Sequence, residues 1–202
     1  MNDIKKIGRP RTFDYEVALT EALTVFWEKG YDGASIRDLT QAMGITGPSL
    51  YAAFGDKREL YLKAIDRYTD AENCEPIIKF ETEEDIEQAV KQFFEAIIGY
   101  ATEHESGARG CFLASSASTN IGQVEGVRER VQQSIVDTEK RLTARFDRAI
   151  KEGKLPADFP SRARARMMFD LRQGYIFRGR VGSSAKELRK TLNDYVQAVI
   201  RT

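Results

Sequence analysis

Residues 35–57 restrict the fold of this chain more than any other segment, and their sequence is SIRDLTQAMGITGPSLYAAFGDK. Two short helical patterns are joined by a tight turn at Gly44, where a residue without a Cβ atom can adopt a positive φ angle. Apolar residues fall where a helix-turn-helix needs its internal core, at Ile36, Leu39, Ile45 and Leu50. The segment therefore predicts a helix-turn-helix unit, whose second helix would enter the major groove of DNA by its N-terminal end.

The rest of the chain repeats apolar residues with helical spacing and shows almost no strand pattern. We predict an all-α fold, with helices over residues 14–29, 35–43, 46–53, 56–73, 83–104, 124–152, 160–179 and 185–201, and a short helix within 110–120. Gly30 and Gly153 suit left-handed helix ends, and Pro76 prevents the fourth helix from continuing. Four helix starts carry a side-chain pair that caps free backbone N–H groups, namely Ser35/Asp38, Asp56/Glu59, Thr82/Asp85 and Ser184/Glu187.

Composition limits the class of protein. The chain has 202 residues, of which 42% are hydrophobic and 31% charged, so it is expected to be globular. Its two cysteines, Cys74 and Cys111, are too few for a disulfide framework, which favours a reducing cytoplasm. The first residues have no apolar stretch of the signal-peptide kind, and no run approaches the ~20 apolar residues of a membrane span. We therefore expect a cytoplasmic protein without a membrane partner.

Charge is unevenly distributed, although 31 basic and 31 acidic residues balance overall. Residues 1–11 have a net charge of +3, residues 70–105 contain eleven acidic residues and two lysines, and residues 151–202 contain twelve basic and five acidic residues. A basic arm, an acidic middle and a basic tail cannot all face one polyanion. Two interpretations of the blocks remain open: solvated helix faces, or pairing between the two chains of a dimer.

The residues from 26 to 62 carry a family resemblance, and they read FWEKGYDGASIRDLTQAMGITGPSLYAAFGDKRELYL. This stretch resembles the N-terminal domain of TetR-family transcriptional regulators, in its Gly-Tyr end of the first helix, its Gly-Ile-Thr turn and its Leu-Tyr-x-x-Phe recognition helix. The resemblance implies a flexible basic arm over residues 1–12, a three-helix helix-turn-helix domain over 13–60, and a helical ligand-binding and dimerisation domain over 61–202.

The same resemblance assigns DNA contacts residue by residue. Thr46 would cap the recognition helix and contact a phosphate, and Tyr51 and Lys57 would contact further phosphates. Base edges would meet Gly47, Pro48 and Ser49, with Arg37 as an additional contact. Many relatives carry Lys or Arg at the position of Gly47 and His at that of Ala52, so direct readout is expected to be thin here. Phe54, by contrast, is expected to pack in the core.

The basic arm offers a second source of DNA contacts. Its Arg9 and Arg11 follow Lys5 and Lys6, and such a strip can lie in a narrow minor groove. A solubilising tail is the other interpretation.

The resemblance also implies a dimer and an inducer site. The last two helices would form a four-helix homodimer interface, to which we assign Met167, Met168, Phe169, Leu171, Tyr175, Leu188, Leu192 and Val196, although an internal core explains some of these residues equally well. The central helices would enclose an unidentified small-molecule inducer. Its expected lining residues are Phe93, Phe94, Ile97, Tyr100, Cys111, Phe112, Ser115, Phe169 and Gln173, an aromatic pattern that simple core packing also produces.

Cys111 lies in the sequence Ala-Arg-Gly-Cys-Phe-Leu, and some relatives sense electrophiles or oxidants through a cysteine. Arg109 and a helix start would favour the thiolate, whereas a buried cysteine acting as a small hydrophobic side chain is the other interpretation. Acidic neighbours of Cys74 disfavour a thiolate there.

An enzyme is not expected. His104 is the only histidine, and neither a P-loop nor a dinucleotide fingerprint occurs, so we assign no catalytic residue, metal site or cofactor. The family resemblance implies a ligand-responsive repressor that binds a palindromic operator as a dimer and is released by a small or reactive inducer. A transcriptional activator, or a ligand-binding protein whose DNA binding is weak or lost, are the alternatives.

Overall fold

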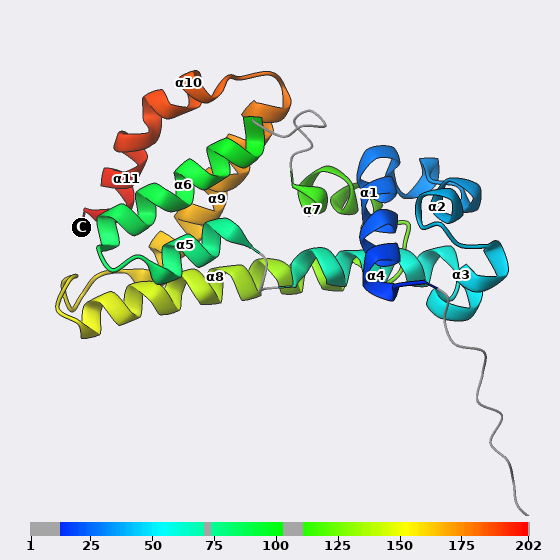
Figure 1. Cartoon of the computed structure of the whole chain (residues 1–202). Coiled ribbons are helices and arrows are strands. Elements are labelled where there is room, and N and C mark those ends of the chain that lie inside the picture. The colour runs from blue at the N-terminus through cyan, green and yellow to red at the C-terminus, as the bar shows by residue number, and fades with distance from the viewer. Residues whose placement is uncertain (1–12, 71–73, 103–110, 202) are drawn as a thin grey trace, which may run out of the picture. The chain divides into compact units, whose positions relative to one another are not determined.

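The computed structural model describes residues 13–70, 74–102 and 111–201, and within these ranges it contains helices and turns but no strand. Two compact units result, residues 1–67 and 68–202 (Figure 1). The first unit contains α1 (Tyr15–Gly33), α2 (Ile36–Ala42), α3 (Gly47–Phe54) and most of α4 (Lys57–Thr69). The all-α expectation is confirmed, whereas the expected domain boundary at residues 60 and 61 stays a prediction.

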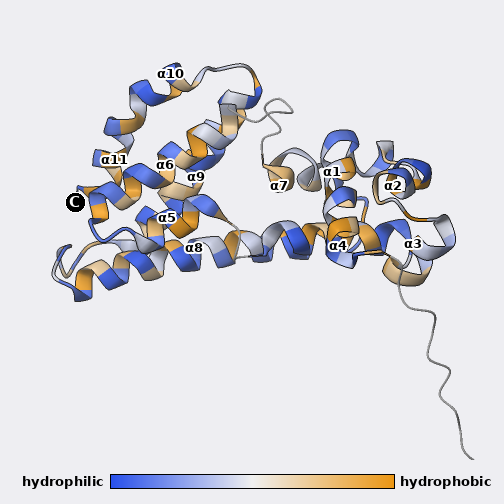
Figure 2. Cartoon of the chain, viewed as in Figure 1, coloured by the Kyte–Doolittle hydropathy of each residue, from blue (hydrophilic) through white to orange (hydrophobic). Residues whose placement is uncertain are grey.

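The second unit is a layered helical body. It contains α5 (Glu75–Thr82), α6 (Ile86–Thr102), α7 (Phe112–Ser115), η2 (Ala117–Asn120), α8 (Val127–Lys151), α9 (Ser161–Arg180), α10 (Ala185–Leu188), η3 (Arg189–Thr191) and α11 (Leu192–Ile200). Helix α6 packs against α5, α9 and α11, and α8 packs along α9. Figure 2 shows hydrophobic and hydrophilic residues alternating along these helices, as one buried side of each helix requires. None of the helices in the described ranges is both long and apolar enough to cross a membrane.

Aromatic rings fill the core of the second unit. Phe80 packs edge-on against Phe93 and Phe146, and Phe94 contacts both Phe93 and Tyr175. Each buried ring removes a large apolar area from water. These contacts join helices α5, α6, α8 and α9 into one core.

Carboxylates of the acidic segment 70–105 pair with arginines of the same chain. The Arg141 guanidinium of α8 donates two hydrogen bonds to the Glu81 carboxylate of α5, with Nε to Oε1 at 2.7 Å. Arg189 contacts Glu95 of α6 at 2.9 Å. From the sequence we considered solvated helix faces or pairing between the two chains of a dimer. These two contacts are instead ion pairs within one chain.

Most predicted helix boundaries agree with the structure, and one region differs. Capping pairs form at Ser35/Asp38, Asp56/Glu59 and Ser184/Glu187. Thr82, however, is the last residue of α5, and it is Asp85 that accepts a hydrogen bond from the Gln88 N–H at the start of α6. The prediction missed α5 because Pro76 was treated only as a helix terminator, whereas proline also suits the first turn of a helix.

Three further details of the helices refine the predictions. Gly30 (φ 71°) and Gly153 (φ 71°) adopt the positive φ expected of them. The C-terminal helix expected over 185–201 is divided into α10, η3 and α11. The short helix expected within 110–120 appears as α7 and η2 in the part of that segment which the structure describes.

Candidate functional site

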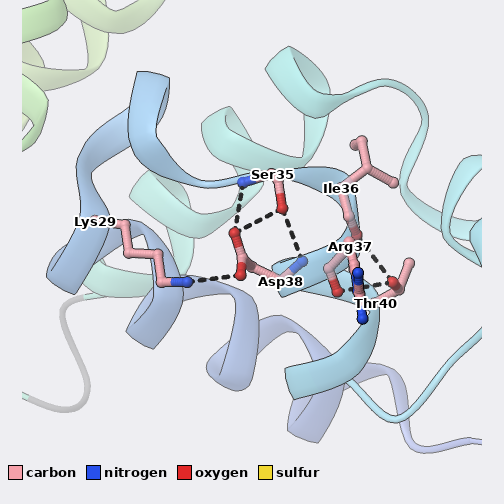
Figure 3. A network of polar contacts seen from close by, with 6 residues as sticks. All are labelled: Lys29, Ser35, Ile36, Arg37, Asp38 and Thr40. Atoms are coloured by element: carbon pink, nitrogen blue, oxygen red, sulfur yellow. Dashed lines mark hydrogen bonds and ion pairs between the residues drawn. The ribbon is translucent and has the colours of Figure 1, made fainter.

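The helix-turn-helix is held by local contacts at the start of α2 (Figure 3). Ser35 Oγ accepts from the Asp38 N–H at 3.1 Å, while Asp38 Oδ2 accepts from the Ser35 N–H at 3.0 Å. Lys29 of α1 contacts the other oxygen of Asp38 at 2.6 Å. Hydrogen bonds from Lys29 and then from Ser35 hold the pKa of the Asp38 carboxyl well below its usual range. This network fixes where α2 begins relative to α1.

The turn and its core match the sequence interpretation in part. Gly44 adopts φ 63°, and the Ile45 N–H donates to the Thr40 carbonyl at 3.1 Å. Leu39 and Leu50 are fully buried, whereas Ile36 and Ile45 are only partly buried. Met43 was not expected in this core and is buried there.

The N-terminal end of α3 is presented to solvent. Thr46 caps it, accepting from the Ser49 N–H at 3.3 Å and contacting the Ser49 hydroxyl at 2.9 Å. Thr46, Pro48 and Ala52 are exposed, while Gly47 and Ser49 are partly exposed. Tyr51 is 53% exposed, and Phe54 is buried and stacked on Tyr15 at 4.5 Å between ring centroids. The burial expected for Phe54 is confirmed, and the Tyr51 side chain is exposed.

Lys57 is the first residue of α4 and directly follows the capping residue Asp56. Its Nζ lies 4.6 Å from the centroid of the Tyr31 ring, a cation–π contact. Tyr31 in turn packs against Phe26 and Tyr61. Sequence reasoning used Tyr31 only as part of the Gly-Tyr pattern and missed its contact with Lys57.

Arg37 enters the network of Figure 3 through its backbone carbonyl, which accepts from the Thr40 hydroxyl at 3.1 Å. Its side chain is exposed. Arg9 and Arg11 lie outside the described residues. The described DNA-binding candidates therefore lie on α2, on α3 with its cap, and at the start of α4.

A polar cluster lies in the second unit and includes two of the residues expected to line an inducer site. The Tyr68 hydroxyl donates to Cys111 Sγ at 3.5 Å and contacts the Tyr100 hydroxyl at 3.3 Å. The Arg172 guanidinium of α9 also contacts Cys111 Sγ, at 3.9 Å. Cys111 itself is 1% exposed. Burial first, and then the neighbouring Cys111, raise the pKa of Tyr68, while burial raises the pKa of Tyr100 to about 12, so both phenols are neutral near pH 7.

Aromatic rings border this cluster. Phe112 packs edge-on against Tyr68 at 5.5 Å, and Phe169 lies 5.7 Å from the Arg172 guanidinium carbon. Of the expected lining residues, the structure thus brings together Tyr100, Cys111, Phe112 and Phe169. Tyr68 and Arg172 were missed, because they are far from Cys111 in sequence and neither belongs to an apolar stripe.

The remaining expected lining residues are three core side chains and two residues with a buried polar atom. Phe93, Phe94 and Ile97 are buried in the hydrophobic core with Phe80 and Phe146. Ser115 Oγ and Gln173 Oε1 are buried polar atoms without a hydrogen-bond partner in the described part of the chain. Within that part, no group of three or more His, Cys, Asp or Glu side chains is arranged to hold a metal ion.

Comparison with known proteins relates both units to one family. Residues 18–64 match the family model described as bacterial regulatory proteins, tetR family, and residues 87–195 match the tetracyclin repressor-like C-terminal domain. The chain is 30% identical over 186 residues to the HTH-type transcriptional repressor ComR of Escherichia coli, covering 91% of this chain and 88% of that protein. It is 43% identical over 65 residues to the repressor BdcR of Escherichia coli, covering 32% and 33%.

A solved structure agrees with these matches. A cysteine-substituted form of the TetR family transcriptional regulator CifR, complexed with 26-bp double-strand operator DNA, superposes with a TM-score of 0.83 at 28% identity. The match covers 95% of this chain and 99% of that one.

Proposed function

This chain belongs to the TetR family of helix-turn-helix transcriptional regulators, and on that premise we propose that it represses transcription by binding a palindromic operator as a homodimer. An inducer bound in the C-terminal unit would release the operator. The protein would act in the cytoplasm, where its DNA is found.

The exposed N-terminal end of α3 is the observation that carries the DNA-binding proposal. Buried Leu50 and Phe54 hold the inner side of α3, and its cap, Thr46, faces solvent. Thr46, Tyr51 and Lys57 would bind phosphates through a hydroxyl, a phenol and an ammonium group. Such contacts fix the position of the helix on DNA without reading sequence.

Recognition of the operator sequence would use the small surface of α3 together with contacts from α2 and from the N-terminal arm. Gly47, Pro48 and Ser49 present little beyond one hydroxyl and an apolar ring, so Ser49 and Pro48 would contact a base edge and a thymine methyl group. Arg37 adds an exposed guanidinium. Arg9 and Arg11 of the arm would supply minor-groove contacts, which favour narrow A·T-rich segments.

Dimerisation would use the outward side of α9. Met167 and Leu171 are partly exposed there, within a shallow groove that also involves Arg162, Ala163, Arg166 and Asp170. Phe177 and Val181 are each 66% exposed. By contrast, Met168, Tyr175, Leu188, Leu192 and Val196 are buried within the protomer, so these members of the expected interface are core residues. A dimer would place its two recognition helices about 34–36 Å apart, in successive turns of the major groove of one operator.

The inducer would release the operator by binding more tightly to a conformation of the dimer in which the two helix-turn-helix units are wrongly spaced for the operator. The cluster around Cys111 is the proposed inducer site, since it combines polar groups with aromatic rings in the C-terminal unit. Reaction of the Cys111 thiol and reversible binding beside it are the two forms that this induction can take.

The test is selection of bound DNA from a random duplex pool, performed with the full chain, with Lys57→Ala and with residues 1–11 deleted. We expect a palindrome from the full chain and weaker enrichment from both variants. Each phosphate contact removed should also reduce the salt dependence of binding by about one unit of log–log slope.

Two outcomes would overturn this proposal. Absence of any enriched sequence at low salt would leave a helical ligand-binding protein without operator recognition. Enrichment unchanged in Lys57→Ala would contradict the assigned phosphate contact. Reporter expression from the selected operator, measured with and without the protein, separates a repressor from an activator.

A further inference from the structure

Gly174 lies inside α9, at a place where its own protomer does not need a glycine. Its backbone is helical, so no positive φ angle requires this residue. A Cβ atom added to it would meet none of the described atoms within 4 Å. Glycine inside a helix is less favourable than alanine, but it lets a second backbone approach closely. This glycine therefore suits a close neighbour from outside the protomer.

The solvent-facing side of α9 is centred on Gly174. Successive residues of an α-helix are rotated by about 100°, so the buried Ala165, Met168 and Tyr175 point more than about 90° away from the direction of Gly174. Val181 follows α9 directly, and its N–H still donates to the Phe177 carbonyl at 3.1 Å. The residues within about 60° of the direction of Gly174 are all exposed or partly exposed, and they are Ala163, Met167, Asp170, Leu171, Phe177, Arg178 and Val181.

These residues are arranged symmetrically about Gly174. In two antiparallel helices related by a two-fold axis, a residue before the axis comes level with the residue equally far after it in the partner. Residues equally far from Gly174 are either both apolar or of opposite charge: Leu171 and Phe177 at three positions, Asp170 and Arg178 at four, and Met167 and Val181 at seven. A second α9 placed in this way matches apolar residues with apolar ones and an acid with a base.

The two charged members of this side are exposed. Neither Asp170 nor Arg178 makes a hydrogen bond or an ion pair with another residue in the described part of the chain. Hydrogen bonds from Ser184, and more weakly the charge of Arg178, lower the pKa of Glu187, whose carboxylate is held at the cap of α10. Both Asp170 and Arg178 are thus available to a second chain.

The apolar members differ between the two halves of this side. Met167 and Leu171, in the first half, line a shallow groove. Phe177 and Val181, in the second half, are each 66% exposed. An antiparallel pair brings the exposed residues of each chain to the groove of the other, where their apolar surface is removed from water.

We propose that α9 pairs with α9 of a second copy in antiparallel orientation, with the two-fold axis at Gly174 and with each Asp170 paired to the partner's Arg178. A parallel pairing would place like charges together at both levels, so the charges select the antiparallel orientation. This pairing rests on the proposed function, because it defines how the homodimer proposed there is assembled. It fixes the orientation of the two protomers, on which the spacing of the recognition helices depends.

The first test is disulfide cross-linking of the full chain in a Cys74→Ser background, which leaves only the buried Cys111. Gly174→Cys lies at the proposed axis and should form an intermolecular disulfide when diamide takes up the two thiol hydrogens. Ala163→Cys is the control, because its two copies would be about 33 Å apart in the antiparallel pair, against about 4 Å between the Cβ atoms of a disulfide. In a parallel pair both variants would cross-link. Non-reducing gel electrophoresis measures the product.

Exchange of charges tests the ion pairs. Asp170→Lys or Arg178→Glu alone places like charges level with each other twice in the dimer, and each should weaken dimerisation by about fivefold or more in sedimentation equilibrium. The double variant restores opposite charges and should regain most of the affinity. Lys140→Glu, which reverses an exposed charge on α8, should dimerise as the unchanged chain does.

The possible failures are distinguishable. A dimer in which Gly174→Cys does not cross-link, or in which Ala163→Cys cross-links equally well, would overturn the antiparallel pairing. Unchanged dimerisation in both single charge variants, or no recovery in the double variant, would overturn the ion pairs. If the unchanged chain is monomeric at every concentration, the homodimer of the proposed function is contradicted and this pairing with it.

Discussion

Single contacts in the first unit show how exposed phosphate-binding candidates are held in place. A lysine side chain has many rotamers, and ordering it at a phosphate costs conformational entropy. Lys57 rests on the Tyr31 ring, which packs against Phe26 and Tyr61. Burial first, and then the nearby Asp56 carboxylate, raise the pKa of Tyr31, so the ring remains a neutral phenol. We infer that Tyr31 is a positioning residue for Lys57.

Replacing the Tyr31 ring should therefore weaken operator binding through Lys57. A cation–π contact at an exposed site contributes about 0.5–1 kcal/mol, so Tyr31→Leu should reduce affinity by about two- to fivefold. Tyr31→Phe retains the ring and should bind as the unchanged chain does. Affinity is measured by fluorescence anisotropy on the selected operator.

A double-mutant cycle separates positioning from a loss of packing. In the Lys57→Ala background, Tyr31→Leu should cause little further loss of affinity, since the side chain that it positions is gone. An equal loss in both backgrounds would show that Tyr31 acts through the fold of the first unit, and melting temperatures of all variants serve as the control.

At the scale of elements, the second unit depends on close approach between α6 and α9. A Cβ atom added at Gly179 of α9 would lie 2.6 Å from the Ala101 carbonyl oxygen and 2.8 Å from the Ala101 Cβ of α6. These are atoms of a helix backbone and of a short side chain, which cannot rotate away. Gly179 is thus required by packing rather than by its own φ angle.

Gly179→Ala should destabilise the second unit by about 1–3 kcal/mol, as overpacking of a filled interior does. Gly33→Ala makes the same chemical change where the nearest atom would be the Lys29 Cβ at 3.6 Å, an ordinary contact. That control should be neutral or slightly stabilising, because alanine favours helix over glycine. Urea unfolding followed by circular dichroism measures both, and equal midpoints for the two variants would refute the close-approach argument.

Proline can stop a helix, and it can also occupy the first turn of one. Pro76 occupies the first turn of α5, where its missing N–H needs no partner. Helix α4 already ends at Thr69, before the proline is reached. Only the packing of Ile77 and Phe80 into the core shows that a helix follows.

For the whole molecule, the proposed binding of a palindromic operator requires two chains. Phe177 of α9 and Val181, the residue directly after α9, are exposed to solvent, and we propose that they extend the interface surface of Met167 and Leu171. Phe177→Glu would bury a charge at that interface if the proposed dimer forms there. We expect this variant to be monomeric by size-exclusion chromatography with light scattering, and to bind the full operator weakly.

The matched control introduces the same charge elsewhere. Val136 of α8 is 57% exposed and lies outside the proposed interface, so Val136→Glu should remain dimeric. A dimer that persists in Phe177→Glu would place the interface on another surface of the second unit.

Local sequence determined much of the first unit. The Ser35/Asp38 cap, the Gly44 turn and the Thr46 cap involve residues at most five positions apart, so their geometry could be predicted from the local sequence. For the same reason the exposed end of α3 could be predicted, together with the burial of Phe54. Membership of the family followed from those same residues.

In the second unit, tertiary structure alone decided which residues contact one another and which side of each helix is buried. Tyr68, Cys111 and Arg172 are separated by 43 and 61 positions, and no periodicity relates them. Helix α9 has apolar residues on more than one side, so spacing could not tell that Met168 and Tyr175 face the core while Phe177 faces solvent. Which side of a helix is buried depends on the helices that pack against it, and those contacts exist only once the chain has folded.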